Sequence, residues 1–189
     1  MKIKIMCMMS LIMLIGVTSL MAKGFQAPSE GKAVVYFTRV SSWGGAYNFE
    51  YFHQDKYIGA FKGKNYMRYE CDPGKQLLWA STENKEFVTT DLKAGETYIV
   101  IVDIIMGGWK PRVGFNPITI DDGELLDRAV ALINKKEAKI TPDAKIKKMN
   151  IKLEKFIDEK LKMYDEKWKH EKNFKHISSD MAIPQNYLK

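Results

Sequence analysis

The residues of this chain whose types could do chemistry are few, and they lie far apart in the sequence. The three histidines are His53, His170 and His176. His170 and His176 are six positions apart, which puts them on different faces of a helix, whereas helical metal sites use histidines four positions apart. The G-x-S-x-G, H-E-x-x-H and C-x-x-C motifs are absent from the sequence. We therefore expect no enzyme active site, no metal and no cofactor.

Two further residues are candidates for chemistry by their type alone. Asp103 interrupts an apolar run and could be a buried carboxylate with a shifted pKa, paired with Lys110 or Arg112. We favour the alternative that it lies at a strand end or faces an open sheet edge, because buried acids are rare. Cys71 is the only cysteine beyond residue 22, so it has no partner for an internal disulfide, and we expect a buried, unreactive side chain.

Tryptophans in two loops give the only indication of a binding site. Trp43 stands beside Gly44 and Gly45, and Trp109 follows Gly107 and Gly108. Both would lie in loops at an end of a β-sheet body, where binding residues gather on a rigid scaffold. Trp43 and Trp109 are our candidate binding residues, and the alternative is that each folds back onto the core.

These candidates depend on a series of short strands in the middle of the chain. Runs of β-branched and aromatic residues alternate with turn signals such as Pro73-Gly74. We predict strands at 32–39, 47–53, 57–61, 66–70, 76–81, 86–90 and 97–106, and an edge strand at 113–120. The run at 97–106 is almost unbroken in apolar residues, which indicates a central strand covered on both faces.

The spacing of these strands, about ten residues, is typical of an antiparallel sandwich. We expect a mainly β fold with some α content, in which a small antiparallel β-sandwich of immunoglobulin or transthyretin type occupies residues 32–120. Without a disulfide, this domain must be stabilised by its apolar core.

The period of the hydrophobic residues changes after residue 120. Residues 121–136 begin with acids and end with lysines, which suits a helix dipole. Thr141-Pro142 predicts the start of a second helix, with Thr141 as the N-cap. From Ile146 to Trp168, apolar residues recur every three or four positions. We predict a short helix followed by one long amphipathic C-terminal helix.

The two predicted helices form a helical extension over 121–172. The remaining residues, 173–189, show little pattern, and we expect a frayed tail there. The apolar stripe of the long helix must be covered, either by the chain's own sheets or by another chain.

The first 22 residues have the pattern of a secretory signal. Lys2 and Lys4 precede an apolar run, and small residues before Ala22 offer a cleavage point. We expect a cleaved signal peptide at 1–22, a polar linker at 23–31 and a periplasmic or secreted protein. The alternative is an uncleaved anchor, for which the apolar run is short. Cys7 lacks the sequence context of a lipid anchor.

The net charge of +7 is unevenly placed. The surplus of lysines lies after Lys135, on the predicted helices. We do not expect nucleic acid as a partner of an exported protein. Contact with a membrane surface stays open, although Glu154 and Asp158 among the lysines weaken attraction to anionic lipid. A solvated helix face is the simplest explanation of the lysines.

Four segments resemble a known family when they are taken in order: KAVVYFTR at 32–39, YIGAF at 57–61, DPGKQLLWAS at 72–81 and LKAGETYIVIV at 92–102. They are similar to the small, PEGA-like β-sandwich domains of unknown function in bacterial envelope proteins. The resemblance covers about residues 31–117. It implies an exported β-sandwich, often a lipoprotein, and brings no catalytic residues to carry over.

From these features we expect a non-enzymatic, exported β-sandwich protein of the bacterial cell envelope with a binding or assembly role. Its partner would be an envelope protein or a glycan. The alternative is an oligomerisation or partner-docking protein that acts through the long C-terminal helix. A third alternative is an enzyme that uses Asp103 and loop residues.

Overall fold

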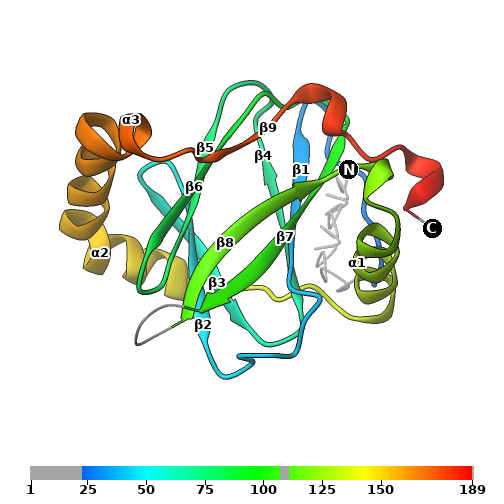
Figure 1. Ribbon diagram of the computed structural model, residues 1–189, viewed down its shortest axis with the longest axis horizontal. Coiled ribbons are helices and arrows are strands. Elements are labelled where there is room, and N and C mark those ends of the chain that lie inside the picture. Colours follow the sequence, from blue (N-terminus) through cyan, green and yellow to red (C-terminus); the bar gives the residue numbers. More distant parts are fainter. Residues whose placement is uncertain (1–22, 107–110, 189) are drawn as a thin grey trace, which may run out of the picture.

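A computed structural model describes residues 23–106 and 111–188, and Figure 1 shows how its elements are arranged. The described chain forms two β-sheets, of four and five strands, with helices on both outer sides. The predicted signal peptide at 1–22 and the candidate residue Trp109 lie outside the described residues.

The strands predicted from the sequence are present within two residues of their expected bounds. The four-stranded sheet has the order β4-β1-β7-β8 and contains β1 (Ala33–Thr38), β4 (Tyr66–Cys71), β7 (Thr97–Met106) and β8 (Pro111–Ile118). The five-stranded sheet has the order β3-β2-β5-β6-β9 and contains β2 (Asn48–His53), β3 (Lys56–Lys62), β5 (Leu77–Ser81), β6 (Lys85–Thr90) and β9 (Lys175–Ile177).

The two sheets share one apolar cluster between them. Phe37 and Phe115 of the four-stranded sheet meet Tyr51 and Phe61 of the five-stranded sheet. The ring of Tyr51 is stacked on Phe61 with centroids 5.0 Å apart and lies 5.2 Å from Phe37. Burial of this apolar surface is the main stabilising contribution, since Cys71, the one cysteine among the described residues, is free.

The first helix covers the outer face of the four-stranded sheet. α1 (Gly123–Lys135) buries Leu126 and Ile133 against Ile99 and Ile101 of β7. The alternate residues of β7, such as Val100, face the inner cluster. The prediction of a central strand with both faces covered is confirmed for the first six residues of β7, which are all buried.

The long helix covers the outer face of the five-stranded sheet (Figure 1). α2 (Asp143–Met163) is followed directly by a π-helical turn, Tyr164–Trp168, and by α3 (Lys169–Glu171). The stripe residues Ile146, Met149, Leu153, Phe156, Leu161 and Trp168 pack around buried Phe52, Tyr57, Trp79, Phe87, Ile157 and Tyr164. The chain's own sheet therefore covers the stripe.

The prediction of one long α-helix holds only in part, because the π-helical turn changes the helical register. The ring of Phe87 on β6 lies 4.5 Å from Tyr164 and 5.9 Å from Trp168, centroid to centroid. The wider turn lets both rings reach the same strand, which is a packing reason for the irregularity.

The expectation of a wholly antiparallel fold is wrong for two strand pairs. β1 pairs with β7 in parallel, and so does β6 with β9. A parallel pair needs a long connection. Residues 39–96, which contain β2 to β6, provide this connection between β1 and β7.

The expectation of a frayed tail at 173–189 is also wrong. The N–H of Asp91, just after β6, donates to the carbonyl of Ile177 in β9 at 2.8 Å. The N–H of Ile183 donates to the carbonyl of Thr97, the first residue of β7, also at 2.8 Å. Ile177, Ile183 and Leu188 are buried. Between them lie two short 3-10 turns, η3 (Ser179–Met181) and η4 (Gln185–Tyr187), and a third, η1 (Ile120–Asp122), precedes α1.

The predicted linker at 23–31 makes specific contacts with the sheet. Phe25 lies 4.8 Å from the ring of Tyr36, centroid to centroid. The N–H of Gln26 donates to the hydroxyl of Tyr36 at 2.9 Å. The segment is therefore docked rather than free.

Asparagine side chains satisfy the backbone at two sheet edges. Asn150 of α2 accepts from the N–H of Tyr57 at 2.8 Å and donates to its carbonyl at 3.1 Å. Asn84 makes the same pair of bonds with Val113 of β8, both at 2.8 Å. Each amide occupies the place of a neighbouring strand and protects an edge that could otherwise pair with another chain.

The N-cap predicted at Thr141 is wrong. Pro142 is the N-cap of α2 and makes no side-chain cap bond. The hydroxyl of Thr141 instead accepts from the N–H of Ala60 on β3 at 3.1 Å. A side chain on Gly59 would lie 3.0 Å from that hydroxyl, so glycine permits this close approach.

Candidate functional site

The loops at one end of the two sheets contain the candidate site, and we call this end the loop end. Strand pairing places these loops at the same end. Thr38 at the end of β1 pairs with Ile101 of β7, and Asn48 at the start of β2 pairs with Lys62 at the end of β3. The β1–β2 loop, residues 39–47, therefore lies beside the β3–β4 turn, at the bottom of Figure 1. Such loops on a rigid scaffold are common binding sites.

Large apolar side chains are exposed at the loop end. Trp43 in the β1–β2 loop is 50% exposed, and Tyr47 is also exposed. Ile105 and Met106, at the end of β7, are exposed as well. Grouped exposed apolar residues of this kind mark interaction surfaces more often than scattered ones do.

Buried Arg39 fixes the shape of the loop that carries Trp43. Its guanidinium donates to the carbonyls of Tyr47 at 3.0 Å and Gly44 at 3.2 Å, and it lies 4.6 Å above the ring of Phe49. Burial lowers the pKa of Arg39, and no ion pair with a described acid offsets that burial. The sequence predicts Arg39 only as the last residue of a strand; its place directly before a glycine-rich loop is the one signal of this role.

A hollow of about 590 Å³ lies beside this loop. It is lined by Ala46, Asn48, Ala60, Phe61, Lys62, Asn65, Lys139, Ile140 and Lys145. The three lysines come from the end of β3, from the α1–α2 connection and from the first turn of α2, and no acidic residue is in this lining. We call it the lysine hollow.

Hydrogen bonds hold the walls of the lysine hollow in place. The N–H of Lys139 donates to the carbonyl of Tyr66 at 2.8 Å, and the hydroxyl of Tyr66 donates to the carbonyl of Lys136 at 3.1 Å. The ammonium of Lys136 donates to Lys64 and Asn65 in the β3–β4 turn. Burial raises the pKa of Tyr66 to about 12, so its hydroxyl keeps its proton as a donor.

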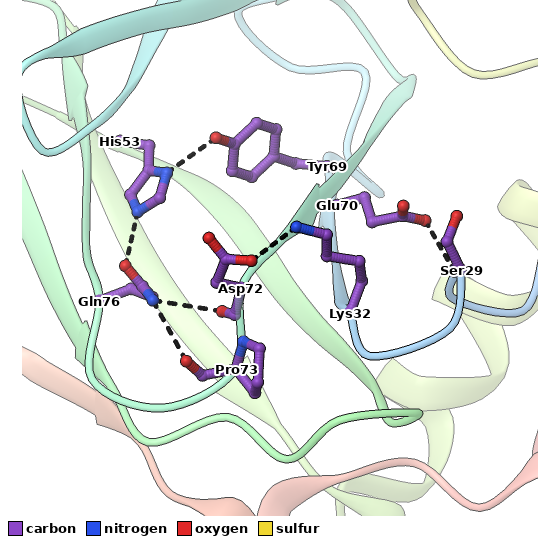
Figure 2. A network of polar contacts seen from close by, with 8 residues as sticks. All are labelled: Ser29, Lys32, His53, Tyr69, Glu70, Asp72, Pro73 and Gln76. Atoms are coloured by element: carbon purple, nitrogen blue, oxygen red, sulfur yellow. Dashed lines mark hydrogen bonds and ion pairs between the residues drawn. The ribbon is translucent and has the colours of Figure 1, made fainter.

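The opposite end of the sheets holds a polar network around His53 (Figure 2). The ring nitrogens of His53 lie 2.8 Å from the hydroxyl of Tyr69 and 2.8 Å from Oε1 of Gln76. The amide nitrogen of Gln76 donates to the carbonyls of Asp72 and Pro73, so its oxygen faces the histidine. Nε2 of His53 is therefore the donor in its contact with Gln76.

This network joins the two sheets. Tyr69 is on β4 and His53 is on β2, and both ring nitrogens are already bonded. Burial raises the pKa of Tyr69 well above its ordinary value. The ammonium of Lys32 lies 2.6 Å from Asp72, and the N–H of Ser29 donates to Glu70 at 3.1 Å, which ties the N-terminal segment to the same end (Figure 2).

The remaining sequence candidates do not come together. Asp103 is exposed opposite Gly114 on β8 and forms no ion pair with Arg112, while Lys110, its other predicted partner, lies outside the described residues. Partial desolvation by its surroundings raises the pKa of Asp103. Burial raises the pKa of Cys71 to about 11, which keeps it a thiol at neutral pH. His170 is exposed, and His176 is exposed and bonded to the hydroxyl of Thr89.

Two negative findings apply to the described residues, 23–106 and 111–188. They contain no group of three or more His, Cys, Asp or Glu side chains placed to hold a metal ion. None of their helices combines the length and the apolar character needed to cross a membrane.

Comparison of the chain with protein-family models, with curated proteins and with solved structures found no match. The geometry of the loop end is therefore the basis for a functional assignment. Trp43 lies there, with Arg39 and the lysine hollow beside it.

Proposed function

We propose that this protein is a non-enzymatic binding module of the bacterial cell envelope, and that the loop end is its binding surface. The observation that supports this best is the half-exposed Trp43 on a loop whose carbonyls are held by buried Arg39. A loop that is already ordered loses little conformational entropy on binding, and an exposed indole offers a large contact area. The partner would be an envelope protein or a glycan.

The fold assignment in its finer form belongs to the same proposal. We assign the two sheets to a β-sandwich of the PEGA-like type, related to immunoglobulin and transthyretin domains. The shared apolar cluster between the sheets supports this, as does the turn at Pro73-Gly74, where Gly74 has a φ of 87°. The helices on both outer faces are additions to that core.

Export and the absence of catalysis are also part of the proposal. The signal-like residues 1–22 support export, and the cleaved product would be periplasmic or secreted, without a lipid anchor. The structural roles of His53 and Cys71 support a non-enzymatic protein, because neither offers a free nucleophile or base. Oligomerisation through the long helix has less support, since its apolar stripe is packed on the sheet.

Sedimentation with isolated cell envelopes tests the proposal. The Trp43→Ala variant should bind the envelope fraction about 10- to 30-fold more weakly than the wild type, as expected for loss of a central aromatic contact. Tyr187→Ala is the matched control, because Tyr187 is similarly exposed but belongs to η4, next to Leu188, which packs in one cluster with α1, and it should bind like the wild type. Equal binding by wild type and Trp43→Ala would refute the proposal.

A further inference from the structure

The lysine hollow concentrates positive charge, which half-buried Glu50 of β2 offsets only in part through its attraction to Lys145. Lys62, Lys139 and Lys145 form no ion pair with any described residue. Lys160 in the last turn of α2 and Lys169 in α3 do pair with neighbouring acids, at 2.7 and 3.1 Å. Cations gathered around one concave surface repel one another, and an anion in the hollow would relieve that repulsion.

Other features of the hollow add to its suitability for an anion. Asn48 is exposed at the first position of β2 and offers an amide to a bound group. The start of α2 lies at the rim, where Pro142 makes no side-chain cap bond, so the positive end of the helix dipole is uncapped. Exposed Asp143 offsets part of this dipole, which leaves the lysines as the dominant charges.

The size and lining of the hollow suit a sugar unit. Its volume of about 590 Å³ is within the range of about 300–1,000 Å³ that is usual for small-molecule sites. Ala46 and Ile140 provide an apolar surface between the charged groups. Ala46 also belongs to the loop that carries Trp43, so the hollow borders that loop.

We infer that the lysine hollow binds a carboxylate- or phosphate-bearing sugar of an anionic envelope polysaccharide, and that Trp43 contacts the neighbouring sugars. The inference rests on the proposed function and names the ligand class for the same end of the molecule. A polysaccharide fits better than a membrane, because the lysines converge on a concave site. The exposed face of α2 beyond it mixes Glu154 and Asp158 with lysines.

Calorimetric titration of the purified protein at constant ionic strength tests the inference. The probe is tetragalacturonate, and its fully methyl-esterified form is the neutral control of the same length. We expect the acid to bind at least about tenfold more tightly than the ester. Equal affinity for the two would overturn the anion assignment.

Two triple variants test the location. Lys62→Gln, Lys139→Gln and Lys145→Gln together should weaken tetragalacturonate binding about tenfold or more, as the sum of three modest charge contacts. The control is Lys75→Gln, Lys155→Gln and Lys167→Gln, which removes the same charge from exposed lysines outside the hollow and should change binding less than about twofold. Equal weakening in both variants would show general attraction to net charge and overturn the inference.

Two further probes distinguish other sources of an anion. Inorganic phosphate should compete only weakly, and saturation by phosphate at lower concentration than by tetragalacturonate would make this a free-anion site. Vesicles of phosphatidylglycerol should bind weakly, and lysine-dependent vesicle binding without tetragalacturonate binding would overturn the polysaccharide assignment.

The same variants separate the inference from the proposed function. If the hollow triple variant binds envelopes like the wild type while Trp43→Ala does not, the inference is wrong and the proposed function stands. If the wild type binds tetragalacturonate but no envelope fraction, the proposed function is wrong and the hollow remains an anion site.

Discussion

Asn150 and Asn84 act on the backbone in a way that their positions in the sequence do not reveal. From the sequence, Asn150 in an amphipathic helix and Asn84 in a turn are both expected to be solvent-exposed. In the structure the amide of each bonds to the backbone of a strand at a sheet edge. Thr141 is a similar case, because a residue with the type and place of an N-cap bonds to β3 instead. Side-chain to backbone bonds over long sequence distances depend on the tertiary fold, so local patterns cannot predict them.

Removal of the Asn150 amide should destabilise the protein. Asn150→Ala leaves the N–H and the carbonyl of Tyr57 without their present partners, and we expect the free energy of unfolding to fall by about 1–3 kcal/mol. Urea denaturation measures the change. Lys155→Ala, on the exposed side of the same helix, is the control and should stay within about 0.5 kcal/mol. A change of less than about 0.5 kcal/mol in the free energy of unfolding of Asn150→Ala would contradict the edge-pairing role.

Glu86 should make stability depend on pH. Burial raises the pKa of Glu86 to about 7, and attraction by Lys172 only partly offsets the rise. In an unfolded chain the pKa of a glutamate is about 4.3. At any pH between the unfolded and the folded pKa, the unfolded state has lost a proton that the folded state keeps. This carboxyl therefore lowers the free energy of unfolding as pH rises from about 4.5 to 7. Because the side chain is partly exposed, we expect a loss of about 1–2 kcal/mol.

The variant Glu86→Gln should remove this dependence. Relative to the wild type, it should be about 1–2 kcal/mol more stable at pH 8 and equally stable at pH 4.5, by urea denaturation at each pH. Glu83 is an exposed neighbour, and the stability of Glu83→Gln should match that of the wild type at both pH values. An unchanged stability of Glu86→Gln at pH 8 would show that the carboxyl is not desolvated as described.

At the scale of elements, positions were predictable from the sequence and pairings were not. β-branched runs and turn residues located the strands from β1 to β8, because these signals are local. The parallel pair β1–β7 depends on which sheet each strand joins, and β9 is a three-residue strand without a periodic pattern. Its stability comes from pairing with β6 and from buried Ile177, neither of which is visible in the local sequence.

The docking of α2 can be tested with two isoleucines of the same helix. Both residues belong to α2, but Ile157 is 1% exposed and Ile151 is 79% exposed. Ile157→Ala should lower the free energy of unfolding by about 2–5 kcal/mol through lost burial and a cavity. Ile151→Ala should change it by less than about 0.5 kcal/mol. Thermal and urea unfolding measure both.

The same pair of variants addresses the oligomer alternative. Sedimentation should give the same mass for the wild type and for Ile151→Ala, because we expect no other chain to pack on the exposed side of α2. A fall in mass with Ile151→Ala, or equal destabilisation by the two changes, would favour pairing of the helix with another chain.

On the scale of the whole molecule, covering both outer faces leaves the ends of the sheets as the open surfaces. α1 and α2 each occupy one face, and the His53 network closes one end with satisfied hydrogen bonds (Figures 1 and 2). The loop end keeps exposed Trp43 and the lysine hollow. Trp43 could be named from the sequence, but Lys62, Lys139 and Lys145 could not, because folding brings together residues that are far apart in the chain.

Site-specific photo-crosslinking in intact cells tests the central claim that partners approach the loop end. A benzophenone amino acid is placed at position 43 or at position 94, an exposed site before β7 at the opposite end of the sheets. We expect covalent adducts to an envelope component from position 43 and none from position 94. Adducts from position 94 with none from position 43 would contradict that claim.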